Sequence, residues 1–179
     1  KAEYKAKIDQ LNKEQVKFDP ALRCGNPGIP RIGPPDKIVQ TKTDIVMLYD
    51  DLNGAFWRIV PFAKKHKDDA EESAMGDSIA SWDGDKLVIE TTTFNDDTWL
   101  TDNGAFHTYN MKVVEELTAG SGKGFEYKLT VHDPEVLAEP WVKTAKIIAT
   151  SDPRQPVPCV EKSIEKMTGI ESYHPNARW

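Results

Sequence analysis

The chain has few cysteines, and none at the spacings that usually bind metals or carry redox chemistry. Its 179 residues contain two, Cys24 and Cys159, with no Cys-x-x-Cys pair and no histidine at a ligand spacing from either. Two cysteines so far apart in sequence predict one disulfide closing a long loop, which the chain-entropy model values at roughly 4–5 kcal/mol. Such a bridge would place the protein in an oxidising compartment. The alternative is two buried free thiols.

Several common catalytic motifs are also missing. The sequence has no glycine-rich phosphate loop, no Gly-x-Ser-x-Gly elbow and no His-Glu-x-x-His helix. Its four histidines are scattered, and their spacing does not support the convergence that a zinc site requires. We therefore expect no metal and no cofactor, so that any catalysis would depend on proton transfer and on the shape of the site.

Long apolar runs and excess positive charge are absent too. No stretch approaches the roughly 20 apolar residues that span a bilayer. The chain opens at Lys1 without Met, as a processed or trimmed chain would, and we expect no remaining signal peptide. The net charge is −6 with both signs mixed, which argues against a nucleic-acid partner. We expect a periplasmic or secreted protein without a membrane span; its oligomeric state is not predicted.

The length suits a single domain over residues 1–179. Apolar residues at helical spacing predict an amphipathic helix over 1–18. The segment 19–35, which we call the strap, is rich in proline and glycine and excludes regular structure. A β-barrel is expected over 36–161, followed by a C-terminal tail over 162–179.

Alternation of apolar and polar residues predicts strands after the strap. The expected strands are 37–42, 44–50, 54–60, 78–82, 86–94, 112–118, 124–132 and 141–150. The charged segment 63–76 is expected to be a loop or a short helix. A mainly β fold follows: an antiparallel, lipocalin-like barrel or a strongly curved sheet of about eight strands, with an N-terminal helix. A barrel of this size has room for one small ligand.

The segment 94–111 is the first candidate for a functional site. It combines Asp96 and His107 with three aromatic residues, Trp99, Phe106 and Tyr109. An acid or base beside apolar walls has a shifted pKa, which suits it to proton transfer. The alternative is a surface loop in which a tryptophan covers the core.

Three charged residues elsewhere are further candidates. Glu115 alternates with Val113 and Leu117, so it is buried if their face is the interior, and a buried carboxylate must be paired or protonated. The alternative places that face outside, under the N-terminal helix. Arg31 could pair with a buried acid such as Glu115 or bind a ligand oxygen. Asp77 could cap a turn or serve as a pocket acid.

Several blocks of the sequence resemble a large family of exported bacterial proteins, most without an assigned function. The blocks are DPALRC (19–24), PGIPRI (27–32), IVQ (38–40), MGDSI (75–79), WDGDKLVIET (82–91), FNDDTWL (94–100), FHT (106–108), VVE (113–115) and PCV (158–160). The resemblance covers roughly 19–160 and implies export, the disulfide and one β-rich domain.

The resemblance also ranks the candidate residues. Arg31, Asp96, Trp99, His107 and Glu115 fall on the family's motif positions, whereas Asp97 does not. This chain departs from the pattern where Asp77 replaces a frequent histidine and where 106–108 replaces Pro-His-Ser. These departures imply a more apolar and more acidic pocket.

The expected function is that of a cofactor-free lyase or isomerase acting on a small hydrophobic molecule, such as a monoterpene epoxide. Asp96 or Asp77 would donate the proton, His107 would be the partner acid or base, and Glu115 with Arg31 would form a buried pair. The aromatic side chains expected to line the cavity are Trp57, Trp99, Phe106, Tyr109 and Trp141. The alternatives are a periplasmic lipocalin-like binding protein with the same cavity, and an exported assembly protein with a filled core.

Overall fold

The computed structural model describes residues 1–120, 124–151 and 159, and within them the fold is mainly β with an N-terminal helix. The short helical elements are η1 (Ala2–Tyr4), α1 (Lys5–Lys13), α2 (Gln15–Phe18) and η2 (Pro20–Arg23). The strands are β1 (Lys37–Gln40), β2 (Asp44–Asp51), β3 (Gly54–Pro61), β4 (Asp77–Asp83), β5 (Lys86–Thr92), β6 (Lys112–Ala119), β7 (Gly124–His132) and β8 (Trp141–Ile148). All eight predicted strands are confirmed, with ends shifted by at most two residues.

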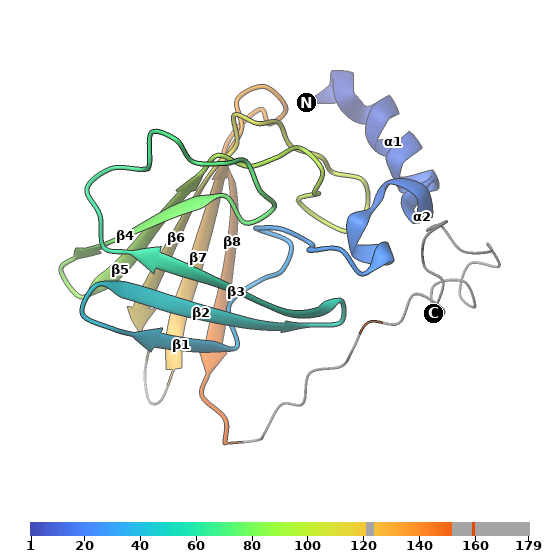
Figure 1. The fold of residues 1–179 in the computed structure, drawn as a ribbon. Helices are drawn as coiled ribbons and strands as arrows, with labels where there is room; N and C mark the ends of the chain where they lie inside the picture. The colour runs from blue at the N-terminus through green and yellow to red at the C-terminus, as the bar shows by residue number, and fades with distance from the viewer. Residues whose placement is uncertain (121–123, 152–158, 160–179) are drawn as a thin grey trace.

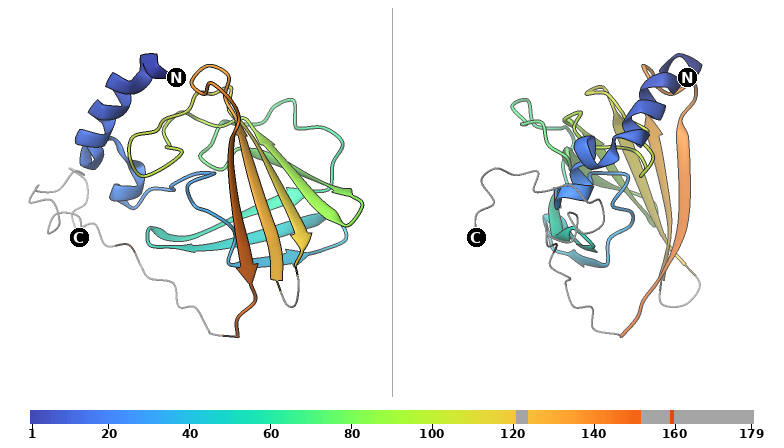
Figure 2. Two further views of the ribbon diagram at one scale, coloured as in Figure 1. Left: turned by 180° about the vertical axis from the view of Figure 1, so that it is seen from behind. Right: turned by 90° about the vertical axis from the view of Figure 1, so that its right-hand side faces the viewer.

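The strands form two antiparallel sheets and not one closed barrel. The first sheet has the order β1-β2-β3 and the second the order β4-β5-β6-β7-β8. A short parallel bridge between Phe62 and Ala80 joins them where β3 passes to β4. The two sheets are stacked obliquely in Figure 1, and Figure 2 shows the larger sheet from behind. The segment 63–76 contains no helix, and the predicted tail over 162–179 lies outside the described residues.

The core lies between the inner faces of the two sheets. Alternation along β2 buries Ile45, Met47 and Tyr49, and Ile89 on β5 and Leu129 on β7 are buried in the same cluster. Every second residue of these strands is therefore removed from water, and this burial is the main source of stability for such a layered fold.

The N-terminal helix packs against the segment 94–111 of its own chain. The ring of Tyr4 meets that of Phe106 edge-on at a centroid distance of 5.5 Å, and Ile8 packs against the buried cluster of Trp99 and Phe106. The terminal amine of Lys1 donates a hydrogen bond to the carbonyl oxygen of Val136 at 2.7 Å. The predicted amphipathic face thus has a partner. None of the helices in the described part of the chain has the length and apolar character needed to cross a membrane.

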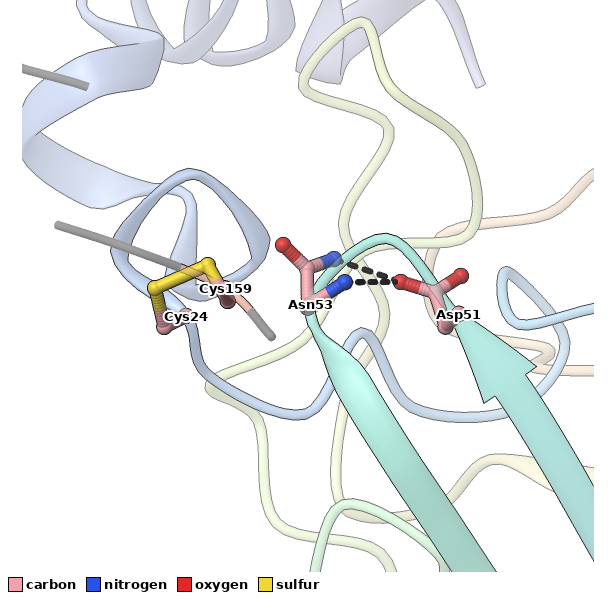
Figure 3. The surroundings of a disulfide bond; sticks show 4 residues. All are labelled: Cys24, Asp51, Asn53 and Cys159. Atoms are coloured by element: carbon pink, nitrogen blue, oxygen red, sulfur yellow. Dashed lines mark hydrogen bonds between the residues drawn. A yellow bond between two sulfur atoms is a disulfide. The ribbon is translucent and has the colours of Figure 1, made fainter. Parts of the chain in front are cut away.

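The strap is ordered because it is attached to the body at several points. Gly28 has φ +75°, and a Cβ there would lie 2.6 Å from Oγ1 of Thr98, so only glycine allows this approach. The strap also carries the predicted disulfide, and Cys24 and Cys159 are bonded with a Cα–Cα distance of 5.6 Å. Figure 3 shows the bridge near the β2–β3 turn. The alternative of two free thiols is therefore wrong.

Candidate functional site

A groove of about 470 Å³ lies where the strap meets the β2–β3 turn, residues 100–102 and the start of β8. Its volume is within the range of small-molecule sites. We call it the strap groove. The described residues that line it are Ala21, Leu22, Pro27, Arg31, Asp51, Leu52, Asn53, Leu100, Thr101, Asp102, Trp141 and Lys143. Two residues predicted to bind substrate, Arg31 and Trp141, are among them.

Half of this lining is apolar and half is polar. Leu100 belongs to the main core, and Trp141 packs against it, so the apolar side of the groove continues into the interior. On the polar side, Asp51 Oδ1 accepts hydrogen bonds from the backbone N of Asn53 at 2.9 Å and from its Nδ2 at 2.7 Å (Figure 3). The turn therefore presents a fixed carboxylate to the groove.

The charge of Arg31 is neutralised by an acid of the strap. Its Nη1 donates to Oδ1 of Asp19 at 2.7 Å, and Asp19 is fully buried. The same oxygen accepts from the backbone N of Ala21 at 3.0 Å. The expected pairing of Arg31 with Glu115 is therefore wrong, because a nearer carboxylate on the same segment takes its place.

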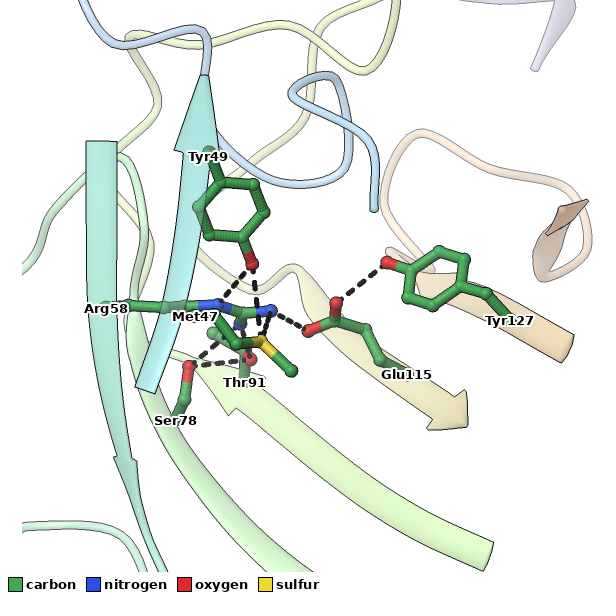
Figure 4. A network of polar contacts seen from close by, with 7 residues as sticks. All are labelled: Met47, Tyr49, Arg58, Ser78, Thr91, Glu115 and Tyr127. Carbon is green, nitrogen blue, oxygen red and sulfur yellow. Dashed lines mark hydrogen bonds and ion pairs between the residues drawn. The ribbon is translucent and has the colours of Figure 1, made fainter. Parts of the chain in front are cut away.

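Glu115 instead pairs with Arg58, a residue that the sequence analysis did not select. Nη2 of Arg58 lies 2.5 Å from Oε2 of Glu115, and the Tyr127 hydroxyl donates to Oε1 at 2.7 Å. The Nε of Arg58 donates to the Tyr49 hydroxyl oxygen at 2.8 Å. Figure 4 shows this network crossing from β3 to β6 and β7. Glu115 thus faces the interior, as the first of its two predicted orientations required.

Burial shifts the pKa values of the two tyrosines and of Arg58 in this network. It raises the pKa of the Tyr49 and Tyr127 hydroxyls well above the usual range, and the charge of Glu115 raises the pKa of Tyr127 further. Burial by itself lowers the pKa of Arg58, but the neighbouring Glu115 outweighs it and the net shift is upward. The network therefore holds two neutral phenols beside the ion pair of Arg58 and Glu115. Arg58 alternates with Phe56 and Val60 on the inner face of β3, and this period of two was the signal that could have found it.

His107 is buried, and both of its ring nitrogens have partners. Its Nδ1 lies 3.1 Å from the carbonyl oxygen of Thr108, which can only accept, so Nδ1 carries the hydrogen. Its Nε2 then accepts from the Thr98 hydroxyl at 2.8 Å. Burial lowers the pKa of His107, although the Thr108 carbonyl and the charges of Asp133 and Asp96 oppose this. These contacts fit a neutral histidine that holds the strap-facing Thr98 in position.

The two predicted proton donors lie at different places. Asp96 acts on His107 through its charge and forms a hydrogen bond with Tyr109, which raises the pKa of that exposed phenol. Asp77 begins β4 and lies 2.7 Å from Nδ1 of His66. Its acidic neighbour Glu90 pairs with Lys112. Neither aspartate lines the strap groove.

The predicted aromatic walls are dispersed as well. Trp99 and Phe106 lie under the N-terminal helix, whereas Trp57 is 65% exposed and Tyr109 is 53% exposed. Trp141 alone of the five lines the strap groove. Among the described residues, no group of three or more His, Cys, Asp or Glu is arranged to hold a metal ion.

Comparison with known proteins gives no relative: no family model, curated protein or solved structure matches this chain. The resemblance to an exported bacterial family therefore stays a prediction.

Proposed function

We propose that the protein binds a small, largely hydrophobic molecule with an oxygen function in the strap groove, and converts it as a cofactor-free lyase or isomerase. The observation that carries this proposal is the composition of the groove. It joins apolar walls, including the Trp141 indole, to the carboxylates of Asp51 and Asp102. Asp102 lines the groove and is exposed, and none of the other described residues forms a side-chain hydrogen bond with its carboxylate, so a ligand in the groove can reach it.

A monoterpene epoxide suits such a site chemically. Opening the strained ring needs a donor at the oxygen: the oxygen takes a proton as the C–O bond breaks, and a cation is left on carbon. An aromatic face stabilises that cation, and a base removes a proton from a neighbouring carbon to form the alkene. The product has the same mass as the substrate. Trp141 would contact the cation and Asp102 would be the base.

The substrate class rests on the sequence. The chain resembles a family of exported bacterial proteins, and the disulfide is consistent with an oxidising, extracytoplasmic compartment. It is also similar in size, and in its expected lack of a cofactor, to the α-pinene oxide lyase of terpene-degrading bacteria. We therefore place the activity in the periplasm or outside the cell, on a terpene epoxide.

Binding without conversion is the second candidate. It is favoured by the contacts of the predicted catalytic residues, because Thr98 holds His107, His66 holds Asp77 and Arg58 holds Glu115. In a lipocalin-like binding protein these contacts would only support the fold. The groove would then hold its ligand unchanged.

Product analysis separates the two candidates. Purified protein would be incubated with a panel of monoterpenes and their epoxides, and the mixture analysed by gas chromatography–mass spectrometry. A lyase yields an isomer of unchanged mass, and this product is lost in Asp102→Asn but retained in Asp69→Asn, a control at an exposed position of the segment 63–76. No product, with a ligand-dependent rise in melting temperature, would favour binding. If the panel yields no product and no ligand raises the melting temperature, the proposal is overturned.

A further inference from the structure

Lys143 lies on the inner face of β8, where the other residues of the strand are apolar. Trp141, Ala145 and Ile147 alternate with the outward residues and pack against the main core. Lys143 falls between them in this period of two, and its cross-strand partner on β7 is the buried Leu129. Directly opposed residues of an antiparallel pair project from the same face of the sheet. Lys143 therefore lies on the inner face of the sheet, where it lines the strap groove and its side chain is exposed.

The ammonium group of Lys143 has no recorded acidic partner among the described residues. Lysines on the outer face of the same sheet behave differently: Lys86 and Lys128 both reach Glu116 at 2.7 Å. The other cation of the groove, Arg31, is engaged by Asp19. Among the described residues, Lys143 is thus the cation of the groove lining that has no acidic partner.

The charge around the groove indicates which ligand suits this donor. Two cations, Arg31 and Lys143, face three carboxylates: Asp51 and Asp102 in the lining, and Asp19 behind Arg31. The net charge of these five described groups is −1, which disfavours a carboxylate or phosphate ligand. A neutral oxygen, such as that of a ketone, ether or epoxide, can accept a hydrogen bond from the ammonium without this repulsion.

We propose that Lys143 selects the ligand of the strap groove by donating a hydrogen bond to a neutral oxygen on an otherwise apolar skeleton. This inference rests on the proposed use of the groove and adds its specificity. The groove would prefer an oxygenated molecule to the hydrocarbon of the same skeleton, and a neutral molecule to the corresponding acid. For the proposed epoxide substrate, the Lys143 ammonium would contact the ring oxygen.

Three probes on one pinane skeleton test this preference: α-pinene, the ketone verbenone and the carboxylic acid myrtenic acid. The ketone cannot undergo epoxide opening, so binding is measured without turnover. Dissociation constants would be taken by titration calorimetry on the full chain. We expect the wild type to bind verbenone about tenfold more tightly than α-pinene, since hydrogen bonds to charged donors are the stronger kind. It should bind myrtenic acid less tightly than verbenone.

Two variants identify the residue responsible. Lys143→Met keeps the length of the side chain and removes the ammonium, so it should abolish the preference for verbenone and change the affinity for α-pinene by less than about twofold. The control is Lys146→Met, which lies opposite Glu126 on the outer face of the same strand and should bind like the wild type. Melting temperatures without ligand would verify that both variants fold.

Each other outcome contradicts a different claim. A preference for verbenone that survives in Lys143→Met would overturn the role of Lys143 and leave the groove standing. Tightest binding of myrtenic acid, lost in Lys143→Met, would make this an anion site and overturn selection of a neutral oxygen. If none of the three probes binds the wild type, the proposed use of the groove fails, and the role of Lys143 fails with it.

Discussion

Arg58 and Glu115 lie on facing sheets, 57 residues apart in sequence, and form an ion pair whose two side chains are 6% and 1% exposed. The remaining hydrogen bonds of the pair go to neighbours on both sheets, including Tyr49 on β2 and Tyr127 on β7. The polar groups of Arg58 and Glu115 therefore all have hydrogen-bond partners only when β3 and β6 take this one relative position. The pair specifies how the two sheets are stacked.

Breaking this pair should strongly destabilise the fold. In Glu115→Gln the Arg58 guanidinium loses its counter-charge inside the core, which we expect to lower the free energy of unfolding by about 3–5 kcal/mol. Glu116→Gln is the matched control, because Glu116 pairs with Lys86 and Lys128 on the outer face of the sheet. Each of these two more exposed ion pairs should contribute less than about 1 kcal/mol to the free energy of unfolding. Urea denaturation would measure both, and equal losses would contradict the assigned burial.

The strands could be predicted from the sequence because each has its own period of two, which local residues determine. The partner of Glu115 could not be predicted in the same way. Arg58 is identifiable as an inward residue of β3, but its pairing with Glu115 depends on which strands face each other across the core. Stacking of the sheets is set by contacts far apart in sequence, which no local pattern reveals, so the prediction of Arg31 as the partner of Glu115 was wrong.

Gly28 and Gly33 provide a test of how closely the strap approaches the body. Both have positive φ, at +75° and +80°, but only at Gly28 would a Cβ collide with Thr98; at Gly33 nothing lies within 4 Å. Gly33→Ala should therefore cost about 1–2 kcal/mol from backbone strain alone. Gly28→Ala should cost clearly more, because a clash is added to the same strain. Similar losses in thermal or urea unfolding would argue against the tight contact with Thr98.

His107 should make the protein sensitive to acid. Its pKa is lowered in the folded state by burial, whereas in the unfolded chain it is about 6.5. The unfolded state therefore binds more protons as the pH falls below about 6.5, and stability declines towards the lowered folded pKa. The decrease in the free energy of unfolding between pH 7 and pH 5, measured by denaturant unfolding at each pH, should be smaller for His107→Gln than for the wild type.

The control for this pH dependence is His132→Gln, because His132 is exposed at the end of β7. The free energy of unfolding of the His132→Gln variant should depend on pH as that of the wild type does. A pH dependence of unfolding that is identical in His107→Gln and the wild type would show that His107 is not the group responsible.

The disulfide should contribute substantially to stability, because the bridged cysteines are 135 residues apart. The chain-entropy model predicts a loss of roughly 4–5 kcal/mol when such a loop is opened. The double variant Cys24→Ser, Cys159→Ser should show this loss in denaturant unfolding, and a reducing agent should lower the melting temperature of the wild type alone. Unchanged stability would indicate that the strap is held by its packing.

The candidate site was only partly predictable. Arg31 and Trp141 were selected from the sequence and line the strap groove, whereas Asp102 and Lys143 were not selected. The groove is assembled from four segments that are distant in the chain, and no local pattern connects them. His107 and Asp96 were predicted because they share the segment 94–111 with aromatic residues. Trp99 and Phe106 of that segment contact the N-terminal helix, whereas its residues 100–102 line the strap groove.

The bridge between Cys24 and Cys159 also determines how the molecule would bear a mechanical load. A force applied at the two termini passes from one cysteine to the other through the sulfur atoms, so the strands between them carry no tension. In a pulling experiment the intact protein should extend only through the segments outside the bridge, and the sheets should rupture only after reduction. A protease cut in any loop between the cysteines would likewise leave one covalent molecule, whose pieces separate only when a reductant is added.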